Sequence, residues 1–339
     1  MAKRTIAVIG GGAWGTALAA HAARLDHQVT LWAREPEVVR DVNAIHENKL
    51  FLDGIGLSKS LRATSDANEA LAGADIVLLV PPSAFLRKVS ESIAADVPKD
   101  ARVVIATKGI ETDSQKLMLD VVAESLPNVT SRSLVVLSGP SFAREVGLGL
   151  PTDVVVASKH EEAALDVQGA LHTPLFRVYT SVDPIGVEVG GALKNVLAVA
   201  AGACEGLGLG TNARAALITR GLSEMARLGV ALGGDPLTFM GLSGVGDLIL
   251  TATGPLSRNR ALGAKVAEGV DPAAYVASQR TVAEGYLTAK AAWQVAQRLG
   301  VDVPITEQVY HVLHEGRPLF EAMKQLMTRA SKGELWGFK

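Results

Sequence analysis

The sequence predicts an α/β protein in which a doubly wound parallel sheet is followed by an all-α C-terminal domain. Up to about residue 180, short runs rich in Val, Ile and Leu alternate with segments of helical periodicity, a pattern typical of a parallel sheet with helices on both faces. After Ser181-Val182-Asp183-Pro184, the remainder is predicted to be helices interrupted by Gly and Pro. With 339 residues and 48% hydrophobic content, the chain can bury two cores. We expect domains at residues 1–183 and 184–339.

The sheet is predicted from short buried runs that are bounded by turn residues. The expected strands are Thr5–Ile9, Gln28–Trp32, Ile76–Val80, Val103–Ala106, Leu134–Leu137 and Asp153–Ala157, with an edge strand at Phe176–Tyr179. Ligands of such sheets bind in the crevice outside the carboxyl ends of the strands. Residues that directly follow a strand are therefore the first candidates for a site.

The second half is predicted from helical periodicity alone. The expected helices are Val187–Ala203, Ala213–Leu232, Ala261–Glu268, Ala283–Leu299, Thr306–Glu315 and Pro318–Ala330. The first of these is so rich in Ala and Gly that its neighbours must pack closely against it. Its apolar stretch Val196–Cys204 is too short to span a bilayer, so no membrane insertion is expected.

Composition limits the partners and the compartment. The net charge is −2 and no basic run is present, which argues against nucleic acid and anionic membranes as partners. Cys204 is the only cysteine, which excludes an internal disulfide and a thiolate zinc cluster, so no metal is expected. The N-terminus is predicted to be a strand rather than a signal peptide, because its apolar run stops at three glycines. We expect a cytoplasmic protein.

The turn Gly10-Gly11-Gly12-Ala13-Trp14-Gly15 predicts a dinucleotide site and with it a Rossmann-type domain. It follows the first strand directly and opens a helix, as the fingerprint Gly-x-Gly-x-x-Gly requires. Gly10 permits the tight turn, Gly12 lets the backbone approach a pyrophosphate, and Gly15 brings helix close to strand. Free N–H groups at the helix start would face the anion.

The end of the second strand bears on the choice of nicotinamide cofactor. NAD-specific sites usually place an acid there, whereas this chain has Arg34, which can pair with a 2′-phosphate and stack on adenine. Glu35 could still hold an unphosphorylated ribose, and Arg34 could be a solvated surface residue. The sequence favours NADP and leaves NAD open.

Two further strand ends carry residues that suit a small anionic substrate. Lys108 follows the fourth strand and can polarise a carbonyl or bind a phosphate, while Gly139 and Ser141 follow the fifth and offer backbone and hydroxyl to a ligand. The alternatives are a surface lysine and an ordinary Gly-Pro turn.

Lys194 lies in the middle of an Ala/Gly-rich helix, where a lysine is unusual because desolvating an ammonium group is costly. It could serve as a general acid that protonates a carbonyl oxygen while hydride reaches the carbon, or its stem could extend to water. Asp247 could orient this lysine or cap a helix.

The segment Ser257-Arg258-Asn259-Arg260 opens a helix after a Gly-Pro turn, so a guanidinium fork and free N–H groups converge there, as in phosphate sites. A simple N-cap with a solvated basic face is the alternative. Glu284, at another helix start, could bind the nicotinamide end of the cofactor.

Together these motifs closely resemble those of the bacterial NAD(P)-dependent glycerol-3-phosphate dehydrogenases. The matching segments are Gly10–Thr16, Ala106–Glu111, Ser138–Glu145, Gly190–Val196, Asn212–Arg220, Gly244–Leu250, Ser257–Arg260 and Val282–Tyr286. The resemblance implies reversible reduction of dihydroxyacetone phosphate to sn-glycerol 3-phosphate, the head-group precursor of phospholipids. It also implies a homodimer.

The resemblance assigns roles to matching positions. Lys194 would be the proton donor and acceptor, and the substrate would be held by Lys108, Gly139, Ser141, Lys194, Asp247, Ser257, Arg258 and Asn259. The cofactor would be contacted by Gly10, Gly12, Ala13, Trp14, Gly15, Arg34, Lys108, Ala143, Arg258, Val282 and Glu284. Two positions depart from the family pattern: family members often have a serine at the position of Ala13 and a proline at the position of Asp53.

Rival functions are distinguished by substrate and by Lys194. A related two-domain dehydrogenase of a hydroxyacid or sugar acid is the nearest alternative, and its substrates carry a carboxylate. A nucleotide-sensing protein without catalysis would have no need of Lys194. A zinc dehydrogenase is excluded because no plausible ligand cluster is present.

Overall fold

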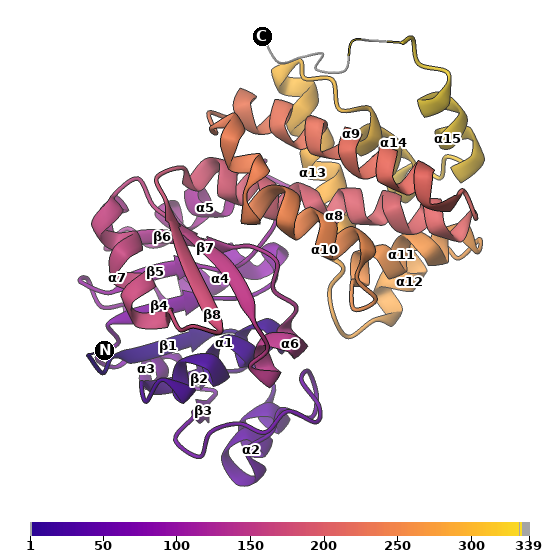
Figure 1. The fold of residues 1–339 in the computed structure, drawn as a ribbon. Helices are drawn as coiled ribbons and strands as arrows, with labels where there is room; N and C mark the ends of the chain where they lie inside the picture. Colours follow the sequence, from indigo (N-terminus) through magenta and orange to yellow (C-terminus); the bar gives the residue numbers. More distant parts are fainter. Residues whose placement is uncertain (1, 332, 334–339) are drawn as a thin grey trace. The chain divides into compact units, whose positions relative to one another are not determined.

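The computed structural model describes residues 2–331 and 333. The chain forms two compact units (Figure 1). One comprises Met1–Thr107 and Met118–Pro184, and the other comprises Lys108–Leu117 and Ile185–Lys339. Each unit has its own hydrophobic core.

The first unit is built on an eight-stranded sheet with the order β3-β2-β1-β4-β5-β6-β7-β8. The strands are β1 Thr5–Ile9, β2 Gln28–Trp32, β3 Arg62–Thr64, β4 Ile76–Leu79, β5 Arg102–Ile105, β6 Leu134–Ser138, β7 Thr152–Ala157 and β8 Phe176–Ser181. The strand order reverses beside β1, which makes the end of β1 the switch point at which ligands of such sheets bind. Neighbouring strands are parallel except β6 and β7. The predicted sheet class is confirmed, with the short β3 added and with β7 and β8 both running opposite to the other strands, because β7 is antiparallel to β6 and β8 is parallel to β7.

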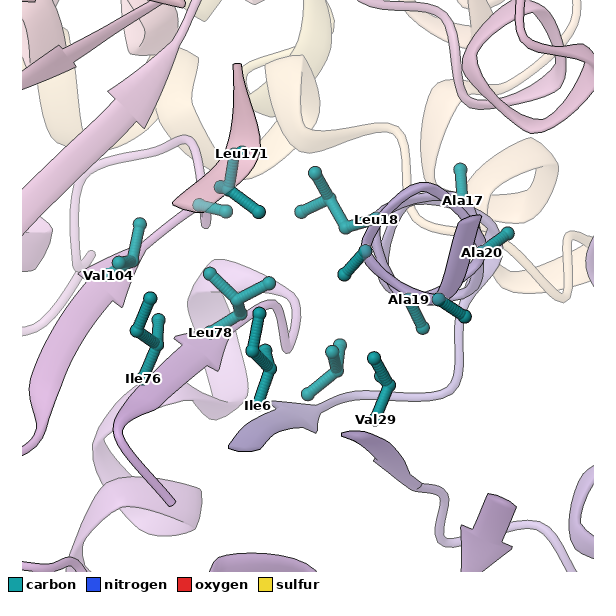
Figure 2. Close-up of a cluster of buried hydrophobic side chains, with 14 of the residues drawn as sticks. Ile6, Ala17, Leu18, Ala19, Ala20, Val29, Ile76, Leu78, Val104 and Leu171 are labelled. Atoms are coloured by element: carbon teal, nitrogen blue, oxygen red, sulfur yellow. The ribbon is translucent and has the colours of Figure 1, made fainter. Parts of the chain in front are cut away.

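Helices cover the sheet and contribute to its core. They are α1 Ala13–Arg24, α2 Pro36–Ile45, α3 Ala67–Leu71, α4 Ser83–Ile93, α5 Met118–Ser125, α6 Ala143–Leu148 and α7 Glu161–Leu171, with a short 3-10 turn at Ser131–Ser133. Figure 2 shows Leu18 of α1 and Leu171 of α7 gathered with Ile6 and Leu78 of the strands, and all four are fully buried. This packing holds the start of α1 at the end of β1.

The second unit is helical. Its helices are α8 Pro184–Gly206, α9 Gly210–Ala231, α10 Asp247–Thr253, α11 Arg258–Ala267, α12 Pro272–Ser278, α13 Glu284–Leu299, α14 Pro304–His314 and α15 Leu319–Met327, with a 3-10 turn at Pro236–Met240 and a π-helical turn at Leu242–Gly246. A Cβ at Gly202 of α8 would collide with the carbonyl oxygen of Arg260, and a Cβ at Gly263 of α11 with that of Val199. The Gly-rich surface of α8 therefore permits the close helix packing expected from its sequence.

Helix α8 is long and apolar enough to cross a membrane by length and composition. Its apolar window is, however, entirely buried inside the unit, and it runs through the helices of the second unit in Figure 1. These are the properties of the core helix of a soluble protein.

Candidate active site

The glycine turn of the first unit contains four glycines. At three of them a side chain would collide with neighbouring protein atoms, and at the fourth it would not. Gly10 has φ +129°, and a Cβ there would lie 2.9 Å from the carbonyl carbon of Val80. A Cβ at Gly11 would lie 2.5 Å from that of Ala33, and a Cβ at Gly15 would collide with the carbonyl oxygen of Gly10. A Cβ at Gly12 would meet nothing within 4 Å. The open side of the turn is therefore at Gly12, where the fingerprint places a pyrophosphate.

The start of α1 suits an anion. Gly12 is its N-cap, and within the described residues no side chain caps this end. The first turn of a helix has N–H groups without partners in the helix, and its dipole favours negative charge. Trp14 Nε1 is buried and has no hydrogen-bond partner among the described residues. These observations fit a dinucleotide whose pyrophosphate is held by backbone N–H groups.

Arg34 follows β2 in the same unit. Its side chain is 77% exposed, and its Nη2 lies 3.2 Å from Glu35 Oε1. The side chain is therefore free to turn toward a ligand at modest cost, since an exposed ion pair is worth little.

Gly139, Ser141 and Ala143 lie together after β6. Gly139 has φ +123°, and a Cβ there would lie 3.0 Å from Cα of Val154, so this position requires glycine. The Ser141 hydroxyl donates to the Gly139 carbonyl at 2.9 Å, and Ala143 is the first residue of α6. The segment is thus a tight turn at a strand end.

The second unit contains a cluster of two lysines and one aspartate, in which Lys194 and Asp247 are buried and Lys108 is partly buried. Lys194 Nζ on α8 donates to Asp247 Oδ1 at 2.6 Å, and Lys108 Nζ donates to Asp247 Oδ2 at 2.7 Å. Thr251, one turn after Asp247 on α10, accepts from Lys194 at 3.0 Å and lies 3.2 Å from Asp247 Oδ1. Asp247 is 0% exposed and Lys194 is 8% exposed. One carboxylate therefore fixes the positions of both ammonium groups.

This environment changes the proton affinity of Lys194. Burial lowers the pKa of its ammonium group to about 8, and the neighbouring positive charge of Lys108 also lowers the pKa, while the Asp247 carboxylate opposes the shift. A lysine with this pKa can be protonated or neutral near physiological pH. It can therefore act as an acid or as a base.

A second polar group in this unit lies at the starts of α11 and α13. Ser257 is the N-cap of α11, and its hydroxyl accepts from the backbone N–H of Arg260 at 3.2 Å. Asn259 donates to Asn195 Oδ1 at 2.8 Å and accepts from the backbone N–H of Gly285 at 2.9 Å. These amides tie α11 to α8, next to Lys194, and to α13, which Glu284 begins. Arg258 is exposed at the helix start, and Val282 is half-buried just before α13.

Each predicted residue thus falls into one of two places. The first unit contains Gly10, Gly12, Ala13, Trp14, Gly15, Arg34, Gly139, Ser141 and Ala143, and the second contains Lys108, Lys194, Asp247, Ser257, Arg258, Asn259, Val282 and Glu284. Thr251 and Asn195 were not predicted from the sequence. A spacing of four from Asp247 could have indicated Thr251, and adjacency to Lys194 could have indicated Asn195.

A Rossmann-type sheet with a pyrophosphate turn, followed by a helical unit with a buried lysine, defines a two-domain nicotinamide-dependent dehydrogenase. Comparison with known proteins narrows this class. Residues 5–164 match the family described as NAD-dependent glycerol-3-phosphate dehydrogenase N-terminus, and residues 183–324 match the corresponding C-terminus family. The chain belongs to the NAD-dependent glycerol-3-phosphate dehydrogenase family.

Individual relatives agree with this assignment. The chain is 52% identical over 331 residues to a glycerol-3-phosphate dehydrogenase [NAD(P)+] of Geobacter sulfurreducens, covering 98% of this chain and 99% of the relative. The crystal structure of glycerol-3-phosphate dehydrogenase from Coxiella burnetii matches with a TM-score of 0.91 at 39% identity, over 96% of this chain and 99% of that chain. A ketopantoate reductase from Ralstonia eutropha shares the fold alone, with a TM-score of 0.60 at 17% identity, over 94% of this chain and 99% of that chain.

Proposed function

We propose that this chain interconverts dihydroxyacetone phosphate and sn-glycerol 3-phosphate, with Lys194 as the catalytic acid and base and with NADPH as the preferred reductant. The observation that carries the proposal is the cluster in which Asp247 holds Lys194 and Lys108 in a site of low exposure. Membership of the dehydrogenase family supports the substrate. The product is the head-group precursor of phospholipids.

In the reduction, C2 of the ketone would receive a hydride, which is the chemistry that a reduced nicotinamide would supply when bound. The ammonium group of Lys194 donates a proton to the carbonyl oxygen as negative charge develops there. Asp247 acts as a positioning residue, because its two oxygens are engaged by the two lysines. Lys108 places a second positive charge close to the reacting oxygen. In the oxidation, neutral Lys194 accepts the hydroxyl proton.

The substrate phosphate is proposed to bind at the start of α11. The guanidinium group of Arg258 presents a fork of donors to phosphate oxygens, and the helix dipole favours the anion. The hydroxyl of Ser257 accepts from Arg260 and retains its own proton for donation to a phosphate oxygen. Asn259 keeps one amide hydrogen for the same purpose after its bond to Asn195. Gly139 and Ser141 are proposed to complete the binding of substrate.

The cofactor is proposed to bind at the glycine turn. Gly12, Ala13 and Gly15 offer backbone N–H groups to the pyrophosphate, and Gly10, whose N–H donates to the Trp32 carbonyl at 3.1 Å, forms the tight turn beside it. Trp14 and Ala143 contact the dinucleotide next to the turn. Arg34 would contact the 2′-phosphate of NADPH, which is the basis of the proposed preference over NADH. Lys108, Arg258, Val282 and Glu284 are proposed to contact the cofactor from the second unit.

A spectrophotometric assay tests the reaction. Dihydroxyacetone phosphate should support oxidation of NADPH, and a 2-keto acid should not. Oxidation of NADPH with a 2-keto acid would instead indicate a hydroxyacid dehydrogenase. Lys194→Ala should lower kcat about 10²- to 10⁴-fold, the usual contribution of general acid catalysis, and should leave NADPH binding nearly intact. Lys290→Ala, at an exposed lysine of α13, is the matched control. A normal kcat in Lys194→Ala would remove this residue from the mechanism.

Location and assembly are proposed at the level of the whole protein. We propose a cytoplasmic enzyme, which agrees with the free, buried thiol of Cys204. We also propose a homodimer, and light scattering coupled to size-exclusion chromatography measures the mass directly. A monomeric mass would contradict the dimer.

A further inference from the structure

The loop after α2 reaches the glycine turn through one buried asparagine. Asn48 is 0% exposed, and its Nδ2 donates to the carbonyl oxygen of Gly11 at 2.9 Å and to Thr16 Oγ1 at 2.7 Å. The side-chain Oδ1 accepts from the backbone N–H of Phe51 at 3.2 Å. The backbone carbonyl oxygen of Asn48 accepts from the backbone N–H of Leu52 at 2.8 Å. Every polar part of the side chain is therefore engaged, and one end of it holds the turn.

The contact with the Gly11 carbonyl fixes a donor on the opposite side of the turn. The carbonyl of Gly11 and the N–H of Gly12 belong to one planar trans peptide unit, so they point in opposite directions. Thr16 Oγ1 adds a second donor to the same carbonyl at 3.3 Å. Holding this oxygen toward the protein turns the Gly12 N–H away from it. Gly12 is also the glycine whose Cβ would meet nothing within 4 Å.

The loop that carries Asn48 is itself anchored. Glu47 Oε1 accepts from the backbone N–H of Gly54 at 2.6 Å, and the backbone of Glu47 pairs with that of Gly56 in an isolated antiparallel β-bridge. At the far end, Arg144 of α6 donates to the carbonyl oxygen of Asp53 at 2.9 Å. Because this contact uses only the backbone of Asp53, the side chain at this position does not decide it. The loop therefore offers Asn48 a fixed support.

We propose that Asn48 is a positioning residue for the cofactor, which acts through Gly11 to aim the Gly12 N–H at the pyrophosphate. The inference rests on the proposed cofactor site. The residue at position 13 makes the backbone donors more important. Ala13 has no hydroxyl group, so the pyrophosphate depends on backbone N–H groups at this point. The orientation of one peptide unit then determines the strength of the contact.

The test is the binding of ADP-ribose and of NADPH, measured by calorimetry without substrate. Asn48→Ala should weaken both about tenfold, the effect of losing one well-aimed donor to a charged group. In steady-state assays, KM for NADPH should rise, whereas KM for dihydroxyacetone phosphate should stay unchanged. Thr16→Val, which keeps the shape of the side chain and removes its hydroxyl, should produce a smaller change of the same kind.

Asn43→Ala is the matched control. Asn43 also makes two side-chain hydrogen bonds to backbone, at 2.8 and 2.9 Å, and both are to Ala63 and not to the glycine turn. Equal weakening in Asn43→Ala and Asn48→Ala would overturn the inference, because it would indicate a structural effect only. Unchanged ADP-ribose binding in a folded Asn48→Ala or Thr16→Val variant would also overturn it. If the unmodified protein bound neither probe, the cofactor site would fail first, and the inference with it.

Discussion

Lys194 is a titrating residue that the fold keeps away from water, so its protonation state should determine how the rate depends on pH. Its pKa is lowered to about 8 by burial. Reduction needs the protonated form, so kcat/KM for dihydroxyacetone phosphate, which reports the pKa of the free enzyme, should fall as the pH rises through about 8. Oxidation needs the neutral form, so kcat/KM for sn-glycerol 3-phosphate should rise over the same range. Rate profiles in both directions measure these two midpoints.

Asp247 provides the control for this assignment. Its carboxylate raises the pKa of Lys194, so Asp247→Asn should move both midpoints to lower pH. If the midpoints moved upward, or if both directions lost activity at high pH, another group would be titrating.

Arg34 should determine which nicotinamide cofactor is preferred. A guanidinium group that meets the 2′-phosphate contributes about tenfold in affinity at a solvent-exposed position, since a hydrogen bond to a charged group is stronger than a neutral one. We expect Arg34→Ala to lower the ratio of kcat/KM for NADPH to that for NADH about tenfold. Arg40→Ala is the control, because Arg40 is 70% exposed and is also paired with its neighbour, Asp41. An unchanged ratio in Arg34→Ala would show that the 2′-phosphate is read elsewhere.

At the scale of elements, α9 and α14 are joined by a buried carboxyl group. Glu224 on α9 accepts from the backbone N–H of Ile305 at 2.6 Å and of Thr306 at 3.1 Å, at the start of α14. It is 2% exposed. The carboxyl group thus satisfies N–H groups that α14 leaves without helical partners.

Burial raises the pKa of Glu224 to about 7, whereas an unfolded chain has the ordinary value near 4.5. The folded state therefore holds this proton more tightly. The resulting stabilisation is present in full below about pH 4.5 and is lost progressively as the pH rises to about 7, by an amount on the order of 3 kcal/mol. We expect the free energy of unfolding of the unmodified protein, relative to that of Glu224→Gln, to fall over this range. Urea denaturation at several pH values measures the difference.

The comparison variant is Glu321→Gln, at an exposed carboxylate on α15. Its stability difference from the unmodified protein should change little with pH. A difference for Glu224→Gln that is constant or grows from pH 5 to pH 7 would contradict the assignment.

The elements that sequence predicted are those with a strong local pattern. Strand β1 and helix α8 have apolar runs or small-residue packing surfaces, and their positions are confirmed. Strand β3, Arg62–Thr64, has three residues and no apolar run, and the π-helical turn before α10 is hidden in a glycine-rich segment. Neither element has a hydrophobic periodicity in the sequence from which it could have been predicted.

The same limit applies to the site. Lys194 was predicted because an ammonium group is costly within an Ala/Gly-rich helix. Thr251 was not predicted, although its spacing of four from Asp247 places the two side chains one turn apart once this segment is taken to be helical. Asn48 lies in a segment without periodicity, and its contact with Gly11 joins residues that are 37 positions apart. Such contacts depend on tertiary structure.

At the scale of the whole molecule, the chain enters the helical unit twice. Residues Lys108–Leu117 belong to that unit although they follow β5 of the sheet. Ile110 and Leu117 pair in a short bridge and are buried in the core of the helical unit. A ten-residue excursion of this kind leaves no signature in local sequence. It places Lys108 in the same unit as Lys194.

Binding of the cofactor should stabilise the folded protein. A substitution at Gly12 should remove this binding without lowering the stability of the unliganded protein. A ligand at 100 times its Kd stabilises the folded state by about 2.7 kcal/mol, so saturating NADPH should raise the melting temperature by several degrees. Gly12 has φ −69° and ψ 178°, which alanine adopts readily, and a Cβ there meets no protein atom within 4 Å. Gly12→Ala should therefore melt close to the unmodified protein, because a weaker N-cap is offset by a less flexible unfolded chain.

The methyl group of Gly12→Ala should instead occupy the space of the pyrophosphate, so that NADPH no longer raises the melting temperature. Gly15→Ala should behave in the opposite way, since its Cβ would collide with the carbonyl oxygen of Gly10 and should lower stability without any ligand. Differential scanning calorimetry of the three proteins, each with and without NADPH, separates the two effects. An undiminished shift in Gly12→Ala would mean that the open side of the turn does not face the cofactor, whereas loss of the shift at unchanged stability would locate the pyrophosphate there.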